Sequence, residues 1–151
     1  DENSTILILG SLPSVKSREQ MFFYGHPQNR FWKVIAALTG EDVPTEIEKK
    51  KALLHKHHIA LWDTIYSCDI VGSSDSSIKN VVPTDIMPII RNSKITRVFC
   101  NGSTSGKYYK RYQQKDTGIE AVVLPSTSPA NAAFSLEKLI KAWNIGLGTS
   151  G

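Results

Sequence analysis

The sequence predicts an α/β protein with three layers, in which helices cover both faces of a short, four-stranded parallel sheet. Short apolar segments such as Ile6–Leu9 and Ile59–Trp62 alternate along the chain with segments of helical periodicity. Strands that are apolar along their whole length are typical of a parallel sheet buried on both faces. The 151 residues correspond in size to one domain, so we expect a single domain over residues 1–151.

The chain opens with a predicted strand and an amphipathic helix. Ile6–Leu9 is the strand, because four apolar residues run directly into Gly10. A helix over about residues 29–38 is predicted from apolar residues that share one helical face, namely Phe31, Val34, Ile35 and Leu38.

A second helix and a second strand follow. Thr45 and Glu48 have the spacing of a capping box, so the helix is predicted to begin at Thr45 and to end near the sequence HKHH. Ile59–Trp62 is the next strand. The Ser- and Gly-rich residues 67–82 predict an irregular surface loop.

The second half repeats the alternation of helix and strand. Helices are predicted around residues 85–91 and 104–114, and strands over residues 95–100 and 119–124. Ser135 is the expected N-cap of a final helix. The inward face of that helix is formed by Leu136, Leu139, Ile140 and Trp143.

Composition narrows the class of protein. The chain is 40% hydrophobic and 21% charged, and its net charge of +4 permits a polyanionic partner without requiring one. No apolar run approaches the ~20 residues that cross a bilayer, and no signal peptide is visible. Cys68 and Cys100 form neither a metal-site spacing nor a disulfide framework. We therefore expect a cytoplasmic monomer with no membrane association.

His55 and His58 are the one pair of residues that suggests a metal. They are separated by three positions, but no cysteine or nearby carboxylate completes a ligand set. Cationic side chains are also favoured at the end of a helix by its macrodipole. We expect neither a metal nor a cofactor.

In parallel α/β sheets, ligands bind beyond the carboxyl ends of the strands. Three segments leave those ends here: GSLPS after the first strand, DTIYSCD after the second and PSTSPANAAF after the last. The first segment is not a dinucleotide fingerprint, and the chain contains no Walker A sequence. A candidate pocket therefore includes Gly10, Ser11, Leu12, Pro13 and Ser14.

Taken together, these segments resemble the uracil-DNA glycosylase superfamily. The similarity rests on LILGSLPS, FFYGHPQNRFWKVIAALTG, IALWDTIYSCDIVGSSDSSI, VFCNG and LPSTSPANAAFSLEKLIKAW, which together run from about residue 6 to residue 143. Of these, GHPQNRFW combined with PSTSPAN is the most specific. The hypoxanthine (deoxyinosine) DNA glycosylases are the most similar branch, and HPQNRFWKVI is also similar to the mismatch-specific uracil/thymine branch.

The resemblance implies removal of a deaminated base from double-stranded DNA, leaving an abasic site. Hypoxanthine comes first and mismatched uracil second. The superfamily usually places Asp or Asn, which positions the attacking water, where this chain has Leu12. In the hypoxanthine branch the asparagine of HPxN is thought to be catalytic, which corresponds to Asn29 here. Backbone amides near Ser11 and Ser14 would stabilise the departing base, and Tyr24 resembles the aromatic residue on which a flipped base stacks.

The remaining candidates line the pocket or contact DNA. His26, Asp63 and Asp75 complete the expected base pocket. Ser126 and Ser128 offer hydroxyls and amides to phosphates. The superfamily inserts a wedge into the vacated base stack at the positions of Pro129, Ala130 and Asn131.

Each candidate also has a structural interpretation. Asn29 is a common N-cap, Tyr24 is suited to the core, and Asp63 and Asp75 are routine turn residues. Trp62, at the end of its strand, is predicted to be buried scaffold rather than a base contact. Two other functions stay open for the whole chain. One is a non-catalytic module that binds lesions, because Leu12 replaces the water-positioning residue. The other is a small-molecule enzyme that hydrolyses a free nucleoside in the same cleft.

Overall fold

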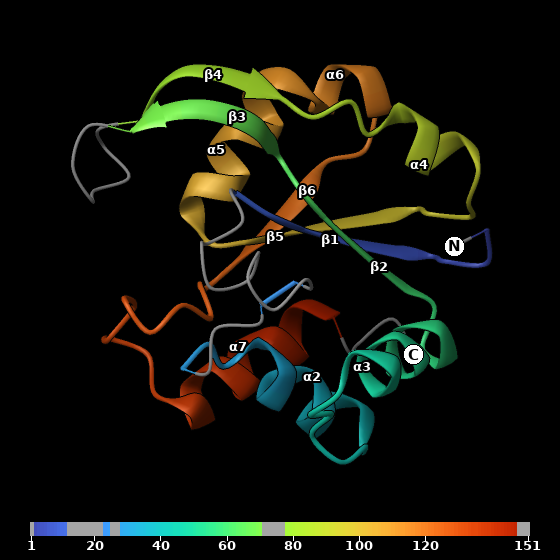
Figure 1. The fold of residues 1–151 in the computed structure, drawn as a ribbon, viewed down its shortest axis with the longest axis vertical. Coiled ribbons are helices and arrows are strands. Elements are labelled where there is room, and N and C mark those ends of the chain that lie inside the picture. The colour runs from blue at the N-terminus through green and yellow to red at the C-terminus, as the bar shows by residue number, and fades with distance from the viewer. Residues whose placement is uncertain (1, 12–22, 25–27, 71–77, 148–151) are drawn as a thin grey trace.

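A parallel sheet forms the centre of the molecule (Figure 1). The computed structural model describes residues 2–11, 23–24, 28–70 and 78–147. Within them the central sheet has four strands in the order β2-β1-β5-β6. The strands are β1 (Ile6–Gly10), β2 (Ile59–Asp63), β5 (Arg97–Asn101) and β6 (Ala121–Leu124), all parallel. The predicted four-stranded parallel sheet is confirmed.

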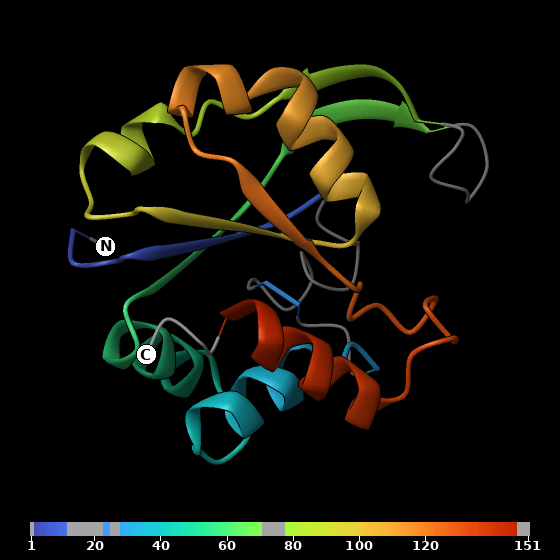
Figure 2. The same ribbon diagram turned by 180° about the vertical axis from the view of Figure 1, so that it is seen from behind.

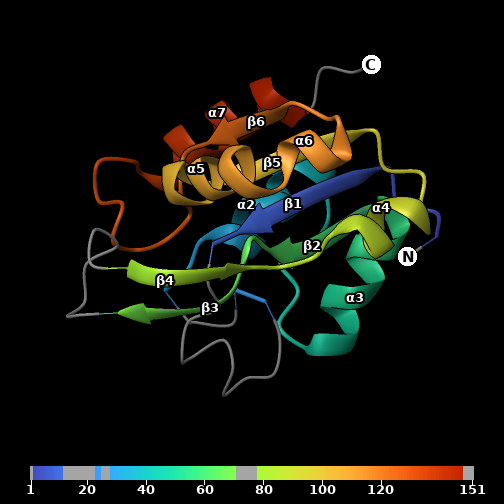
Figure 3. The same cartoon turned by 90° about the horizontal axis from the view of Figure 1, so that it is seen from above.

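Helices cover both faces of this sheet (Figures 1 and 2). One face carries α2 (Phe31–Thr39), α3 (Ile47–Lys56) and α7 (Leu136–Leu147). The other carries α4 (Met87–Arg91), α5 (Ser103–Tyr112) and α6 (Gln114–Thr117), and the view from above places α5 and α6 over β5 and β6 (Figure 3). The three-layer α/β/α architecture is therefore confirmed. None of the described helices has the length and apolar character that a bilayer crossing requires.

The two hydrophobic layers follow from the alternation of side chains along β1. Ile8 packs with Phe31 and Trp143 on the side of α2 and α7. Its neighbours Leu7 and Leu9 point to the opposite face, where they join a second cluster with Tyr109. All six of these side chains are fully buried, and each contributes about 1.5–3 kcal/mol through removal from water. An apolar strand thus serves two cores.

The irregular loop predicted for residues 67–82 is wrong. β3 (Ile65–Ile70) and β4 (Ile78–Pro83) form an antiparallel pair in this part of the chain. Ser and Gly suggested a loop, but the branched and apolar residues at the ends of the segment favour strand pairing. Residues 71–77, between the two strands, lie outside the described residues.

The helix starts were predicted with mixed success. The capping box at Thr45 was wrong. The N-cap of α3 is Glu46, with an extended backbone and no side-chain cap bond, so the Thr45 hydroxyl lies one residue too far from the first turn. Ser135 was correct, because its Oγ accepts a hydrogen bond from the Lys138 N–H at 3.3 Å. Leu139 and Trp143 are fully buried, as expected.

Candidate active site at the carboxyl edge of the sheet

The four parallel strands end side by side. Gly10 is in register with Asp63 on β2, and Asn101 at the end of β5 is in register with Leu124 on β6. The loop of residues 125–134, called here the 125–134 loop, leaves the sheet at this same edge and leads to α7 (Figures 1 and 2). This is the edge at which parallel α/β proteins bind their ligands.

Gly10, Asp63 and Tyr24 meet at this edge. A Cβ atom at residue 10 would lie 2.7 Å from Asp63 Oδ1 and 3.1 Å from Tyr24 Oη, so the close approach of these two groups requires glycine. The Tyr24 ring stacks on Phe31, with centroids 4.1 Å apart and an angle of 20° between the planes. One face of the Tyr24 ring is therefore occupied by the protein.

Tyr24 is held in an unusual state. Its φ of 54° is in the left-handed region, which costs a non-glycine residue free energy and is often found at functional sites. Its Oη is buried and has no hydrogen-bond partner in the described part of the chain. Burial raises the pKa of the hydroxyl and the Asp63 carboxylate raises it further, while the neighbouring Asn101 side chain acts in the opposite direction. Tyr24 is therefore a neutral phenol throughout the physiological range.

Asn29 is joined to the end of the sheet through Thr127. Its Oδ1 accepts hydrogen bonds from the Phe31 N–H at 2.9 Å and from the Thr127 hydroxyl at 2.8 Å. Asn101 contacts Thr127 twice, because its Nδ2 donates to Thr127 Oγ1 and its Oδ1 accepts from the Thr127 N–H, both at 3.0 Å. We call these three residues the Asn29–Thr127–Asn101 network. It positions Asn29 at the same edge as Gly10. The expected N-cap role of Asn29 is wrong, because the N-cap of α2 is Arg30, although Asn29 still accepts a hydrogen bond from the first residue of the helix.

Arg30 tethers the 125–134 loop to the start of α2. Its backbone N–H donates to the Thr127 carbonyl at 3.1 Å. In the described part of the chain, its guanidinium donates only to backbone carbonyls, those of Thr127 at 3.4 Å, Ser128 at 2.8 Å, Asn131 at 3.1 Å and Phe134. The planar fork of an arginine is suited to several acceptors at once, so one side chain fixes the course of the loop.

The predicted DNA contacts lie on this tethered loop. Ser126 Oγ accepts from the Ser128 N–H at 3.1 Å, Ser128 Oγ accepts from the Ala130 N–H at 3.2 Å, and Asn131 Nδ2 donates to the Ser126 carbonyl at 3.0 Å. Pro129 and Ala130, at the turn of the loop, are exposed. An open groove of about 550 Å³ runs beside them, lined by Ser103, Ser126, Ser128, Ala130, Asn131 and Phe134 among others.

The remaining pocket candidates are only partly described. The Gly10 and Ser11 carbonyls accept hydrogen bonds from the Thr64 and Ile65 N–H groups at 2.8 and 2.9 Å, so this segment continues alongside the start of β3. Leu12, Pro13, Ser14, His26 and Asp75 lie outside the described residues.

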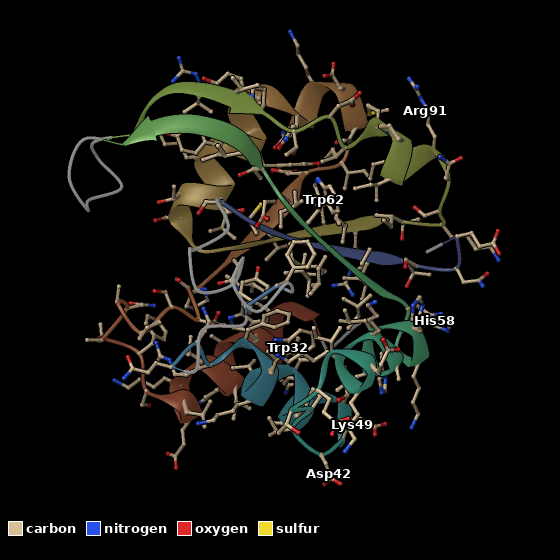
Figure 4. All side chains as sticks on the ribbon, in the orientation of Figure 1. Trp32, Asp42, Lys49, His58, Trp62 and Arg91 are labelled. Atoms are coloured by element: carbon tan, nitrogen blue, oxygen red, sulfur yellow. The ribbon has the colours of Figure 1, made fainter. Side chains whose placement is uncertain are left out.

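Trp62 differs from its predicted role as buried scaffold. It is 42% exposed and lies on β2, an edge strand of the central sheet (Figure 4). Its ring lies 6.0 Å from that of Phe23, at an angle of 50°. An exposed aromatic surface therefore borders the site.

Sequence reasoning missed three residues that organise the site: Arg30, Asn101 and Thr127. Asn101 carried a usable signal, because it is the polar residue at which the apolar strand VFC ends. Thr127 and Arg30 carried no such signal. Thr127 lies between two serines, which were predicted to contact DNA instead, and Arg30 has the sequence context of an ordinary surface charge. Their importance comes from contacts across 97 or 98 positions of sequence.

Comparison with known proteins identifies the class. The family model "Uracil DNA glycosylase superfamily" matches residues 1–145, which is nearly the whole chain. The chain belongs to this superfamily and is a DNA glycosylase, an enzyme that hydrolyses the bond between a base and its sugar in DNA.

Relatives and a solved structure agree with this assignment. A hypoxanthine DNA glycosylase from Methanosarcina acetivorans is 38% identical over 137 residues, which cover 89% of this chain and 85% of that protein. A protein of the same name from Methanosarcina barkeri is 34% identical over 150 residues, covering 95% and 90%. The solution NMR structure of a candidate uracil DNA glycosylase from Methanosarcina acetivorans has a TM-score of 0.80 and 36% identity, covering 93% of this chain and 88% of that one.

Proposed function

We propose that this DNA glycosylase removes hypoxanthine, and more slowly mismatched uracil, from double-stranded DNA, with Asn29 at the centre of the reaction. The observation that carries the proposal is the Asn29–Thr127–Asn101 network, which holds the HPQN asparagine at the carboxyl edge of the sheet. The names of the two relatives, both hypoxanthine DNA glycosylases, favour hypoxanthine as the first substrate.

The proposed reaction begins when the damaged base leaves the duplex. Flipping costs a few kcal/mol and is cheapest at mispairs, such as those that deamination produces. The flipped base would stack on the face of Tyr24 that Phe31 does not cover. Pro129, Ala130 and Asn131 would occupy the gap, while Ser126 and Ser128 hold the strand through its phosphates.

Bond cleavage then releases the base. The bond between C1′ and the base nitrogen breaks, and its electron pair leaves with the base. The oxygen of a water molecule forms a bond to C1′, and one proton of that water ends on the base. Negative charge grows on the base as it departs, so fixed donors that face it lower the barrier. No paired carboxylates of the kind used by O-glycosidases are needed.

The decisive experiment measures base release under single-turnover conditions with the parent protein and Asn29→Ala. We expect Asn29→Ala to reduce cleavage of a duplex containing deoxyinosine by about 100-fold, the effect of losing one preorganised catalytic group. Asn92→Ala is the matched control. Asn92 is an exposed asparagine that donates to the Pro88 carbonyl at the end of α4, and α4 lies at the opposite end of the sheet from the carboxyl edge (Figure 1).

Three substrates separate the alternatives. A duplex with deoxyinosine, a duplex with mismatched uracil and the free nucleoside inosine are offered to the same preparation. Binding of the duplexes without release of either base would indicate a lesion-binding module, and release from inosine alone would indicate a nucleoside hydrolase. Full cleavage by a folded Asn29→Ala protein would contradict the proposed role of Asn29.

A further inference from the structure

The direction of every hydrogen bond in the Asn29–Thr127–Asn101 network is fixed, because the side chains of Asn29 and Asn101 each face a backbone N–H group, which can only donate. The Thr127 N–H points at one side-chain atom of Asn101, at 3.0 Å, which must therefore be the carbonyl oxygen. The other side-chain atom of Asn101 is then the amide nitrogen, and it donates to Thr127 Oγ1 at 3.0 Å. The Thr127 hydroxyl accepts at this contact, so its own proton is available for donation to another acceptor.

The same reasoning fixes Asn29. The Phe31 N–H lies 2.9 Å from one side-chain atom of Asn29, which must be the oxygen Oδ1. The Thr127 hydroxyl lies 2.8 Å from that oxygen and donates its one proton to it. Thr127 is fully buried, so solvent does not compete for this bond. A carbonyl oxygen has two lone pairs, and protein donors engage both of them.

We propose that Asn29 acts on its substrate as a hydrogen-bond donor through Nδ2, and that Thr127 is the positioning residue that imposes this orientation. This inference rests on the proposed function, because it requires Asn29 to lie at the reacting centre. With Oδ1 occupied, Asn29 neither orients water by accepting its proton nor acts as a base. Its target is an acceptor that gains negative charge as the base departs, such as a ring nitrogen or the carbonyl oxygen of hypoxanthine.

This role differs from water positioning by a carboxylate or amide oxygen. A donor stabilises the electron pair that leaves with the base, so it acts on the bond that breaks rather than on the bond that forms. The proton of the attacking water then passes to the departing base, and Asn29 neither accepts nor relays it.

Asn29→Asp tests the donor directly. The substitution keeps the shape and the acceptor for Phe31 and Thr127, but replaces the N–H₂ group with a second oxygen. We expect single-turnover release of hypoxanthine to fall by about 100-fold or more at pH 8. Because a protonated carboxyl donates one O–H, the ratio of variant to parent rate should rise about tenfold for each unit by which the pH falls toward the usual carboxyl pKa near 4. A rate at pH 8 equal to or above that of the parent overturns the proposal, as does a loss that acid does not relieve.

Thr127→Val and Thr127→Ser test the positioning role. Valine keeps the volume without the hydroxyl, so we expect kcat to fall about tenfold while KM for the deoxyinosine duplex stays within about twofold. Serine restores the hydroxyl and should return kcat to within about threefold of the parent. The same pair of substitutions at Thr117, whose hydroxyl contacts Tyr109 beside α6, is the matched control for a lost threonine hydroxyl. Equal losses in the two Thr127 variants would indicate packing and overturn the positioning role.

The two proposals fail in different ways. Unchanged cleavage by Asn29→Ala contradicts the placement of the reaction at Asn29, and with it the donor. Loss of cleavage in Asn29→Ala together with full activity of Asn29→Asp overturns the donor alone. Circular dichroism and the urea midpoint of each variant confirm that the measured protein is folded.

Discussion

The carboxylate of Asp63 fills the space beside Gly10, with Oδ1 2.7 Å from the place where a Cβ of residue 10 would lie. Gly10→Ala therefore forces Asp63, and Tyr24 behind it, away from the edge of the sheet. We expect base release to fall by about tenfold or more and the free energy of unfolding to fall by about 1–3 kcal/mol, as is usual when a packed site is overfilled. Single-turnover kinetics and urea unfolding measure the two effects.

Gly106→Ala controls for crowding alone. A Cβ at residue 106 would approach Val123 Cγ2 to 2.5 Å, yet Val123 is 52% exposed and its side chain has room to rotate. We expect this variant to keep its cleavage rate per folded molecule. An equal loss of activity in both variants would argue that general strain, rather than displacement of Asp63 and Tyr24, explains the Gly10 result.

Tyr24→Phe removes a buried hydroxyl that has no hydrogen-bond partner among the described residues. A buried polar group without a partner costs stability, so we expect the variant to be as stable as the parent or more stable by up to about 1 kcal/mol. Base stacking should survive, because the ring remains. Thermal unfolding gives the stability, and a clear loss of stability would show that the hydroxyl does have a partner.

The raised pKa of Tyr24 also predicts a pH dependence. Burial and Asp63 disfavour the phenolate in the folded protein, whereas the unfolded chain ionises near its usual pKa of about 10. The folded state binds the extra proton above that pH, so the stability contributed by Tyr24 is complete below pH 10 and declines as the pH rises above it. Urea midpoints at pH 8 and pH 11 should fall more for the parent than for Tyr24→Phe. Equal declines would contradict a raised pKa.

Arg30→Lys keeps the positive charge of the side chain but loses the planar guanidinium with its several donors. A lysine cannot reach the four loop carbonyls together, so several acceptors lose their partner, and we expect a destabilisation of about 1–3 kcal/mol. Hydrogen exchange at residues 128–134 should become faster, and affinity for lesion-containing duplex should fall. Arg91→Lys, at an exposed arginine on α4 (Figure 4), is the matched control. Unchanged exchange in the loop of Arg30→Lys would show that other contacts hold it.

Asn131→Gly tests the proposed wedge. The side chain of Asn131 donates to the Ser126 carbonyl at 3.0 Å, so glycine removes both that bond and the volume. We expect weaker capture of duplex containing deoxyinosine, with a salt dependence nearly unchanged, because the phosphate contacts remain. Each contact with duplex DNA contributes a slope near −0.9. Binding isotherms from low to moderate salt measure both quantities, and an unchanged preference for the lesion would place the wedge elsewhere.

The sequence predicted the layers of this fold because local periodicity determines them. Ile6–Leu9 is apolar at every position, and a strand of this kind is stable only between two covered faces. The β3–β4 pair was missed because its stability comes from main-chain pairing between segments whose composition resembles a loop. Trp62 was misjudged for a related reason, since exposure depends on which elements lie over a strand end rather than on the strand itself.

The sequence predicted a candidate site residue only where that residue belongs to a recognisable local motif. Asn29 and Tyr24 were selected as candidates from the HPQN motif and its surroundings, and both lie at the carboxyl edge of the sheet. Thr127 was not, because its role is to connect Asn29 with Asn101, and those partners are 98 and 26 positions away. A hydrogen-bond network is a property of three-dimensional neighbours, and no local pattern in the chain encodes it.

Arg30 contacts the 125–134 loop through backbone carbonyls alone among its described hydrogen bonds. A carbonyl is present whatever amino acid occupies the position, so this part of the loop's shape does not depend on which side chains the loop displays. Substitutions at Pro129 and Ala130, which are exposed, should therefore alter the surface that we propose to contact DNA without altering the loop backbone that Arg30 holds. The exposed side chains of the loop are therefore replaceable without loss of its backbone shape. Libraries randomised at these two positions offer a route to glycosylases with new lesion or opposing-base preferences.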